Sequence, residues 1–325
     1  MSVSTSNDEL ADLFRLISSL YISVSKDKAK KYKSEIFAKA AAAIESYPKE
    51  IISGAEFSAS TPGSGKSVAE AIDEYLTTGK ITRLDELEAL EPERTKTIRL
   101  YTGVFGIGTV KANTLYESGY KTLEDLLYAP LTSAQKWGLY YYYHFKENIP
   151  RSEIDIYYTR VKKLFDTYFP NVIWEIGGSY RRGSPSSGDI DIAIKQTPGL
   201  TLDTIIDKLT RDELLVGTLS MGEHKFLGIG KLDDNSIARR VDVFLYPEHE
   251  WVYALLHVTG SGQFNKLLRK RAIEFGLTLS EKGMHVEGTN QWYPANTEED
   301  VFNYLRVYYL TPEQRTKKIN YLQTY

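Results

Sequence analysis

The sequence predicts an α+β protein whose first half is helical and whose second half combines strands with helices. Two observations predict this fold class. Before Pro150, apolar residues recur at the spacing of three and four that is typical of helices; after it, short runs alternate apolar and polar residues as strands do. The length of 325 residues suits several compact units better than one core.

Composition excludes several classes of function. The chain has no cysteine, which rules out disulfides, zinc fingers and thiol catalysis. No apolar run approaches the roughly 20 residues of a membrane helix, and Met1 to Leu10 lacks the features of a signal peptide. We therefore expect a soluble, intracellular protein without a membrane partner. The net charge of -3 argues mildly against a nucleic-acid binder.

The first helical stretch carries local positive charge. Helical spacing from Asp8 to Tyr47 predicts two helices or more, ended by Pro48. Between residues 26 and 39 only two carboxylates oppose six lysines, namely Lys26, Lys28, Lys30, Lys31, Lys33 and Lys39. A solvated helix face explains such a run as well as a phosphate-binding surface does, so neighbouring motifs must decide between them.

Two glycine-rich turns interrupt the helical half. One is Thr61-Pro62-Gly63-Ser64-Gly65-Lys66-Ser67, and the other runs from Gly103 to Lys111. Turns of this kind between two helices expose backbone N–H groups at a helix N-terminus, where phosphate oxygens bind well. They predict two helix-hairpin-helix motifs that grip a DNA backbone without reading its sequence.

Two alternatives to this interpretation remain open. The first turn nearly matches a nucleotide-binding P-loop, but Ser60 replaces its first glycine and no strand precedes it. Both turns could also be ordinary connections between helices. The aromatic run Leu139 to Phe145 could stack on bases, but consecutive aromatics cover every side of a helix, so we favour core packing.

The second half alternates helices and strands. The pattern predicts a helix through Val161, Leu164 and Phe165, a crossover helix from Thr201 to Leu209, and strands at Val172–Ile176, around Asp189–Ile194, Lys225–Leu232 and Arg240–Tyr246. From Glu248 onward we expect a helix through Leu255, Phe264, Leu267 and Leu268, short polar strands and a tyrosine-rich helical end.

Three aspartates are the strongest candidates for chemistry. Asp189 and Asp191 share one face of a strand, and Asp242 occupies the same pattern about fifty residues later, with apolar residues on the opposite face of both strands. Three converging carboxylates repel one another unless hard divalent cations neutralise them, and magnesium prefers oxygen ligands. The sequence therefore predicts a two-metal site for nucleotidyl transfer.

A glycine turn precedes these aspartates. Gly177 and Gly178 allow close approach of the backbone to a ligand, and Ser179 and Arg182 offer a hydroxyl and a guanidinium to triphosphate oxygens. Gly188 keeps the same pocket free of a side chain, and Arg181 could instead pair with a local carboxylate.

In a two-metal mechanism, all three aspartates would hold the ion that activates a primer 3'-hydroxyl. Asp189, Asp191 and the triphosphate would hold the ion that stabilises the leaving pyrophosphate. Asp242 is then the natural acceptor of the hydroxyl proton. We expect two magnesium ions, for which manganese can substitute.

From about Leu10 to its C-terminus, the chain resembles the family X DNA polymerases, within them the polymerase beta type. The matching landmarks follow one another in order: Ser53-Gly54-Ala55-Glu56, Ile72-Asp73-Glu74-Tyr75, Thr78-Gly79-Lys80, Gly106-Ile107-Gly108, Lys121 to Leu126, the carboxylate motifs, Thr259-Gly260-Ser261 and Phe264-Asn265-Lys266. The resemblance implies a helical lyase-type DNA-binding domain (1–84), a helical DNA-binding subdomain (85–148), a nucleotidyltransferase-type palm (149–248) and a small nucleotide-selection subdomain (249–325).

The resemblance also implies roles for single residues. Ser179, Arg182 and Gly188 would bind the triphosphate, Asn265 would face the minor-groove edge of the incoming base, and His257 and Gly260 would line the nucleotide site. Arg240 would contact the primer backbone, and Arg269 would hold the template, although a surface charge also explains Arg269. The glycines of the two turns, Gly63, Gly65, Gly106 and Gly108, would bind DNA phosphates, with a monovalent cation at the turns as a further candidate.

One departure from the family concerns its lyase chemistry, in which a lysine forms a Schiff base with the aldehyde of a 5'-deoxyribose phosphate. Ala71 stands at the position of that lysine. Lys66 and Lys80 are only weak substitutes, since an offset of five residues turns Lys66 away from Ala71. We expect lyase activity to be absent or very weak, and the domain to bind gapped DNA through Lys33, Lys39 and the turn at Gly63 and Gly65.

Further departures concern the nucleotide. His257 and Val258 replace two aromatic residues near the 2'-position of the sugar, which predicts weaker rejection of ribonucleotides. Gly262 stands where a side chain often packs on the base, and Phe244 follows the lambda-type pattern in place of an arginine. The connection between Lys231 and Arg239 is short, without the long insertion associated with template-independent transferases.

The resemblance predicts a distributive polymerase that fills short gaps during base excision repair, acting on gapped or nicked duplex DNA and dNTP. We expect a monomer without BRCT-mediated partners or proofreading, located in a nucleus or, if viral, in cytoplasm or virion. Another nucleotidyltransferase, or a catalytically idle DNA-binding protein, remains the alternative.

Overall fold

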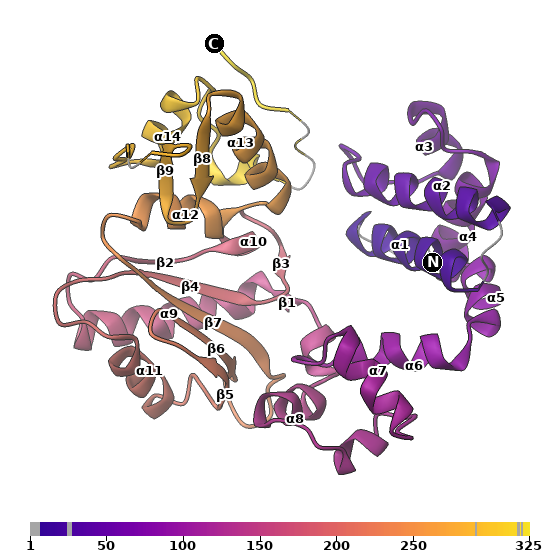
Figure 1. The fold of residues 1–325 in the computed structure, drawn as a ribbon, viewed down its shortest axis with the longest axis horizontal. Coiled ribbons are helices and arrows are strands. Elements are labelled where there is room, and N and C mark those ends of the chain that lie inside the picture. The colour runs from indigo at the N-terminus through magenta and orange to yellow at the C-terminus, as the bar shows by residue number, and fades with distance from the viewer. Residues whose placement is uncertain (1–6, 25–27, 290, 317–318, 320) are drawn as a thin grey trace. The chain divides into compact units, whose positions relative to one another are not determined.

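The computed structural model describes residues 7–24, 28–289, 291–316, 319 and 321–325 (Figure 1). Its internal contacts divide the chain into two units. The first comprises residues 1–101 and 109–121, and the second comprises residues 102–108 and 122–325. Each unit is described by itself below.

The first unit is helical, as the sequence predicts. Its core consists of apolar side chains from the first five helices, among them Phe14, Phe37, Phe57 and Ile72. The helices α1 and α2 precede Pro48 as expected; Lys26 lies outside the described residues. Its helices among the described residues are α1 (Asn7–Ser23), α2 (Lys28–Glu45), α3 (Gly54–Ser60), α4 (Lys66–Thr78), α5 (Thr82–Leu90), α6 (Glu93–Thr102, whose last residue belongs to the second unit) and α7 (Thr109–Glu117).

The first glycine turn joins α3 to α4. Gly63 has a φ of +89°, and a Cβ on Gly63 or Gly65 would meet no atom within 4 Å, so the turn is open to a ligand. By contrast, the two helices are tightly packed, since a Cβ on Gly54 would lie 2.0 Å from the carbonyl oxygen of Ala69. A helix and not a strand precedes the turn, which contradicts the P-loop alternative.

The second glycine turn precedes α7. Gly106 has a φ of +80°, and its carbonyl oxygen accepts a hydrogen bond from Nε2 of Gln135 at 2.8 Å. The following elements are the 3-10 helix η1 (Asp125–Tyr128), α8 (Ser133–Tyr140) and the 3-10 helix η2 (His144–Lys146).

The aromatic run does not form one packed helix, because α8 ends at Tyr140. Tyr142 is buried as we expected, but Tyr140 and Tyr143 are 74% and 71% exposed. The preference for core packing is therefore correct for only part of the run.

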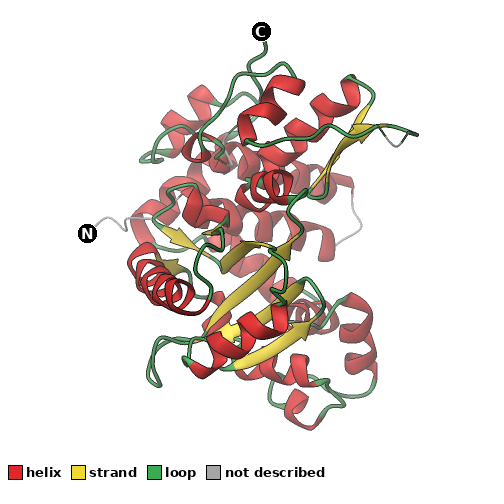
Figure 2. Cartoon of the chain, turned by 90° about the vertical axis from the view of Figure 1, so that its left-hand side faces the viewer, coloured by secondary structure: helices red, strands yellow, loops and turns green. Residues whose placement is uncertain are grey.

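The centre of the second unit is a sheet of five strands in the order β2-β4-β7-β6-β5. Figure 2 draws the strands in yellow. The strands β4 and β7 are parallel, and the other pairs are antiparallel. The elements are β1 (Ile149–Pro150), α9 (Arg151–Tyr168), β2 (Trp174–Ile176), α10 (Gly178–Arg181), β3 (Ser186–Ser187), β4 (Ile190–Lys195), α11 (Leu202–Arg211), β5 (Gly217–Met221), β6 (Lys225–Gly230) and β7 (Arg239–Tyr246). The strand β5 was not predicted from the sequence.

The two central strands alternate as the sequence predicts. Ile190, Ile192 and Ile194 of β4 are buried with Val241 and Val243 of β7 in one core that also includes apolar residues of α9 and α11. The opposite face of the same strands therefore carries the polar residues. This core fixes the register of the strands, because a shift by one residue would bury the carboxylates.

The C-terminal part of the second unit corrects two expectations. The single helix expected through Leu255 and Phe264 is two helices, because Gly260 adopts a φ of +69° and Ser261 caps the second one. Beyond α14, the tyrosines of the described residues lie outside α-helices, so the expected helical end is wrong. The elements are α12 (Trp251–Thr259), α13 (Gly262–Glu274), β8 (Leu277–Ser280), β9 (Gly283–Val286), α14 (Glu298–Tyr304) and η3 (Pro312–Gln314).

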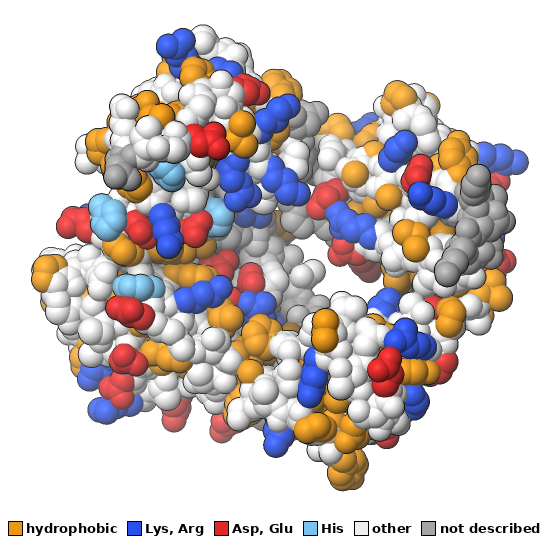
Figure 3. Space-filling view, in the orientation of Figure 1, with side chains coloured by type: hydrophobic (Ala, Val, Ile, Leu, Met, Phe, Trp, Pro, Cys, Tyr) orange, Lys and Arg blue, Asp and Glu red, His pale blue; other side chains and the backbone are white. Residues whose placement is uncertain are grey.

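Two surface properties follow from the described residues. No helix among them is long and apolar enough to cross a membrane. On the face shown in Figure 3, basic and acidic side chains are interspersed, so the net charge of -3 does not form one continuous acidic surface there.

We predict that Gly54→Ala destabilises the first unit by about 1–3 kcal/mol, because the added methyl group would press on the backbone of Ala69 and force α3 from α4. Urea unfolding monitored by circular dichroism measures the effect. Gly65→Ala, which meets open space, serves as the matched control. Equal stability of the two variants would contradict the close packing of the hairpin.

Candidate active site

The three predicted aspartates lie together. Asp191 of β4 and Asp242 of β7 occupy paired positions on neighbouring strands, and Asp189 immediately precedes β4. One carboxylate oxygen of each lies within 4.8 Å of those of the other two. Asp242 is buried, while Asp189 and Asp191 are half-buried. The strand register thus produces the cluster that the sequence predicts.

The cluster is electrostatically strained. Burial, together with the charges of Asp189 and Asp242, raises the pKa of Asp191 to about 7. Burial, with a contribution from Asp189, raises the pKa of Asp242 to about 6, although Arg240 opposes the shift. Both groups therefore favour the protonated state more than a free aspartate with a pKa of about 3.9 does.

Two cations partly balance these carboxylates. Nη2 of Arg240 donates a hydrogen bond to Oδ2 of Asp242 and lies 3.7 Å from Oδ2 of Asp189. Its guanidinium carbon lies 5.4 Å from the ring centroid of Phe105. Lys225 is the second cation, and its charge lowers the pKa of both Asp191 and Asp242.

The residues present suit a hard divalent cation. The donor set is three carboxylates, which magnesium and manganese both accept. Oδ1 of Asp242 is buried and has no hydrogen-bond partner among the described residues, so it retains its capacity as a ligand. The charges of Arg240 and Lys225 do not fully neutralise the three carboxylates, because the pKa of Asp191 is still raised.

The glycine turn before β4 is shaped by the protein itself. Gly178 has a φ of +57°, and a Cβ there would lie 2.8 Å from Oδ2 of Asp191. A Cβ on Gly177 would lie 3.0 Å from Cγ1 of Val258. A side chain at either position would displace Asp191 or Val258, and the positive φ of Gly178 also favours glycine, whereas the sequence suggested only the approach of a ligand.

The candidate triphosphate residues lie on or beside α10. Oγ of Ser179 donates to Oγ of Ser187 at 2.7 Å, and Nη1 of Arg182 donates to the carbonyl oxygen of Thr259 at 2.6 Å. Burial lowers the pKa of Arg182, and the charge of Asp191 partly opposes this. Gly188 is exposed, and a Cβ on it would meet nothing within 4 Å.

The expectation of a local partner for Arg181 is wrong. Nη1 of Arg181 lies 2.9 Å from Oε1 of Glu298, which is 117 residues away in sequence. The pair connects α10 to the first residue of α14.

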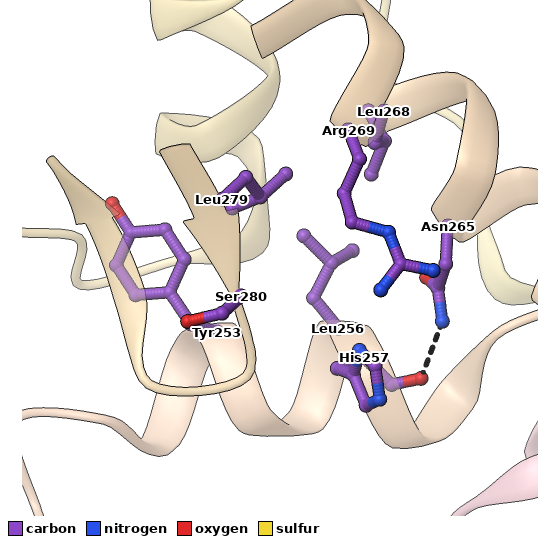
Figure 4. A pocket seen from close by; sticks show the side chains of 8 residues that line it. All are labelled: Tyr253, Leu256, His257, Asn265, Leu268, Arg269, Leu279 and Ser280. Carbon is purple, nitrogen blue, oxygen red and sulfur yellow. Dashed lines mark hydrogen bonds between the residues drawn. The ribbon is translucent and has the colours of Figure 1, made fainter. Parts of the chain in front are cut away.

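A small cavity in the C-terminal part holds three further predicted residues (Figure 4). His257, Asn265 and Arg269 line it, and Nδ2 of Asn265 donates to the carbonyl oxygen of His257 at 2.8 Å. Burial lowers the pKa of His257. Gly260 lies outside this lining, but a Cβ on it would be 3.2 Å from Nη1 of Arg182, which links it to α10.

The first unit contains a separate cavity of about 210 Å³ beside Ala71. Lys33 and Arg83 supply its positive charges, whereas Lys66 and Lys80 are not among its lining residues. Three carboxylates also line it, those of Glu70, Glu74 and Glu86. Lys39 is exposed on α2 outside this lining.

Four family models match successive parts of the chain. They are described as a helix-hairpin-helix domain at residues 5–81, the fingers domain of DNA polymerase lambda at 99–146, the DNA polymerase beta palm at 148–248 and the DNA polymerase beta thumb at 254–316. The chain belongs to the family X DNA polymerases. All three aspartates lie within the residues matched by the palm model.

Curated relatives of this family X chain carry two names. It is 30% identical over 334 residues to DNA polymerase lambda of Arabidopsis thaliana, an alignment that covers 95% of the chain and 62% of that protein. It is 31% identical over 306 residues to DNA polymerase lambda of Rattus norvegicus, covering 88% and 52%. It is 29% identical over 322 residues to DNA nucleotidylexotransferase of Xenopus laevis, covering 86% and 63%. The chain thus spans between about half and two thirds of the length of these relatives.

Sequence reasoning missed three residues of the site. Lys225 pairs with Phe244 across β6 and β7, and its ammonium group lies 5.2 Å from that ring centroid. Side chains alternate between the two faces of a strand, so the place of Lys225 beside the strand of Asp242 can be worked out once the pairing of β6 and β7 is known. Phe105 and Glu298 gave no local signal, because each meets its partner only through the fold.

We predict that magnesium binding to the metal-free protein releases about one proton at pH 6 and none above pH 8, because cations bind the deprotonated forms of Asp191 and Asp242. The affinity should accordingly rise from pH 6 to pH 8. Calorimetric titration in two buffers of different ionisation enthalpy measures the release. Asp242→Asn should release fewer protons, and equal release at pH 6 and pH 8 in the unmodified protein would contradict the raised pKa values.

Proposed function

We propose that this chain is a template-directed DNA polymerase that fills short gaps in DNA during repair. The observation that carries the proposal is the carboxylate cluster, since three aspartates meet within 4.8 Å on one face of the palm-type sheet. Beside it, α10 and the cavity at Asn265 offer polar groups for a nucleotide. The names of the relatives, DNA polymerase lambda and DNA nucleotidylexotransferase, support DNA nucleotidyl transfer in general.

Each of the three aspartates has a proposed role in the reaction. Asp189 and Asp191 would hold two magnesium ions and Asp242 one of them. When bound, these ions neutralise the carboxylates and stabilise charge on the attacking and leaving oxygens. Asp242 is the proposed acceptor of the proton from the primer 3'-hydroxyl, and its raised pKa suits a base near neutral pH.

Other residues would bind the substrates, a gapped or nicked duplex and a dNTP. Ser179 and Arg182 would bind the triphosphate, Gly188 would leave room for it, and Asn265 and His257 would face the nucleotide. Arg240 would exchange its partner Asp242 for a primer phosphate, and Arg269 would contact the template.

The open glycine turns support a grip on the DNA backbone. Gly63 and Gly65 leave free space in front of the turn, as does Gly108 in the second one. Lys33 and Lys39 would add phosphate contacts. A monovalent cation at the turns and the monomeric state are further parts of the proposal.

One observation favours template-directed synthesis over template-independent addition of nucleotides. The connection between β6 and β7 consists only of residues 231–238. It is held locally, since Oγ of Ser236 accepts from the backbone N–H groups of Leu232 and Asp233. The connection therefore lacks the long insertion that the family resemblance associates with template-independent transferases.

The proposed polymerase lacks efficient lyase activity. Ala71 lies at the wall of the cavity in the first unit and cannot form an imine. Lys33 is the one lysine among the lining residues, on a different helix from Ala71. The acidic lining by Glu70, Glu74 and Glu86 also disfavours a phosphate-bearing sugar.

The central test is magnesium-dependent extension of a primer across a one-nucleotide gap. We expect incorporation directed by the template base, and a loss on the order of 10³-fold in Asp242→Ala, which removes a metal ligand and the proton acceptor. Asp207→Ala, on the exposed side of α11, serves as the control and should retain activity. Extension without a template would instead indicate a tailing enzyme, and equal activity of Asp242→Ala would overturn the role of the cluster.

A second test uses a 5'-deoxyribose phosphate substrate and borohydride, which traps a Schiff base. We expect the unmodified protein to be trapped roughly a hundredfold less than Ala71→Lys, which restores an amine at the cavity wall. Residual trapping should disappear in Lys33→Ala. Efficient trapping of the unmodified protein would refute the loss of lyase activity.

A further inference from the structure

Arg240, a cation beside the aspartate cluster, contacts two separate parts of the second unit. Its Nη2 donates a hydrogen bond to Oδ2 of Asp242 and lies 3.7 Å from Oδ2 of Asp189. Its guanidinium carbon also lies 5.4 Å from the ring centroid of Phe105. Phe105 precedes all strands of the palm-type sheet in the chain. An aromatic ring from outside the sheet is therefore in contact with the arginine that neutralises the cluster.

One donor of Arg240 has no acceptor. Its Nε is buried and has no hydrogen-bond partner among the described residues. A buried N–H without an acceptor is unfavourable, and the face of an aromatic ring compensates for this only in part. The side chain of Arg240 is nevertheless 28% exposed, so a ligand can reach it. Arg240 thus retains hydrogen-bonding capacity that the oxygen of an anion would satisfy.

Phe105 belongs to the second glycine turn. It directly precedes Gly106, and the open Gly108 follows in the same turn. Within the turn, the backbone N–H of Ile107 donates to the carbonyl oxygen of Val104 at 3.0 Å. The segment proposed to receive a DNA phosphate therefore also carries the ring that contacts Arg240.

The helix α8 holds Phe105 in place. A Cβ on Gly138 would lie 2.7 Å from the carbonyl oxygen of Phe105 and 2.8 Å from its Cβ, so the two segments are in close contact. Next to Phe105, the carbonyl oxygen of Gly106 accepts a hydrogen bond from Nε2 of Gln135 at 2.8 Å. Phe105 also packs on a small core formed by Leu219, Ile229 and Ala238. The position of the ring is thus fixed independently of Arg240.

We propose that Phe105 is a positioning residue for the primer terminus, because it keeps the guanidinium of Arg240 in place while Arg240 exchanges Asp242 for a primer phosphate. This inference rests on the proposed polymerase function. Once Asp242 is released, the contact with Phe105 still restricts the long arginine side chain and limits the entropic cost of aligning the primer. An aliphatic side chain would pack there but would not attract a cation as the face of an aromatic ring does.

The variants separate the aromatic contact from simple packing. Phe105→Leu keeps an apolar side chain but removes the aromatic face, and Phe105→Tyr restores that face. Phe105→Met replaces the leucine variant if the latter does not fold, because methionine adapts to irregular apolar space. Phe145→Leu is the matched control, since Phe145 packs on the same small core and its ring contacts Tyr141.

The first measurement is one-nucleotide gap filling. Phe105→Leu should lower kcat about tenfold and change the KM for dNTP less than about threefold, because the primer and not the nucleotide is misaligned. Phe105→Tyr should retain the activity of the unmodified protein, as should Phe145→Leu. In an Arg240→Met background, Phe105→Leu should have less than about a twofold effect, because its action requires the guanidinium.

The second measurement does not depend on catalysis. The Nε–H signal of Arg240 in nuclear magnetic resonance spectra can be identified by its loss in Arg240→Lys. Exchange of this proton with water reports how firmly the guanidinium is held. Phe105→Leu should accelerate the exchange about tenfold, whereas Phe105→Tyr and Phe145→Leu should leave it unchanged.

Four results would overturn the proposal. They are unchanged kcat in Phe105→Leu, an equal loss in Phe145→Leu, failure of Phe105→Tyr to restore kcat, and an undiminished effect of Phe105→Leu in the Arg240→Met background. If the unmodified protein extends no primer, it is the proposed function that fails. The exchange measurement then decides separately whether Phe105 holds Arg240, and unchanged exchange in Phe105→Leu would refute this.

Discussion

The mutual repulsion of three aspartates is the constraint around which the second unit is built. Folding places Asp191 and Asp242 on adjacent parallel strands, where burial makes their charges unfavourable. The apolar residues on the opposite face of β4 and β7 stabilise this register, because any slip would move carboxylates into the core. Arg240 and Lys225 balance only part of the negative charge of the three aspartates. The folded protein therefore still favours the binding of cations at this site.

The aspartate cluster could be predicted because its causes are local. Alternation along a strand fixes which side chains share a face, and the motif around Asp189 and Asp242 identifies the two strands. The break between α12 and α13 was missed, since the apolar spacing continues across it and only the backbone of Gly260 reverses direction. The partner of Arg181 could not be predicted either, because Glu298 approaches it only after α12, α13 and α14 have packed.

In the first unit too, the sequence shows which residues are present, but only the fold shows which of them lie together. The resemblance to the family predicts that Ala71 stands in place of a lysine, but the sequence does not reveal which other lysine lines the same cavity as Ala71. The packing of α1, α2, α4 and α5 selects Lys33 and leaves Lys66 and Lys80 outside the cavity. It also brings three glutamates to the same wall, although they are spread over two helices. Under the proposed function, the alanine therefore lies in a cavity whose acidic lining disfavours a phosphate-bearing sugar.

The glycine turn before β4 has a consequence for nucleotide affinity. The backbone N–H of Gly177 donates to the carbonyl oxygen of Asp191 at 2.7 Å, and the backbone N–H of Ser184 donates to that of Ser179 at 3.0 Å, so contacts within the protein hold this turn. The backbone loses its conformational freedom during folding, before any ligand arrives. If this turn binds the triphosphate as we propose, it is pre-organised, and a nucleotide would bind without the entropic penalty of ordering a loop.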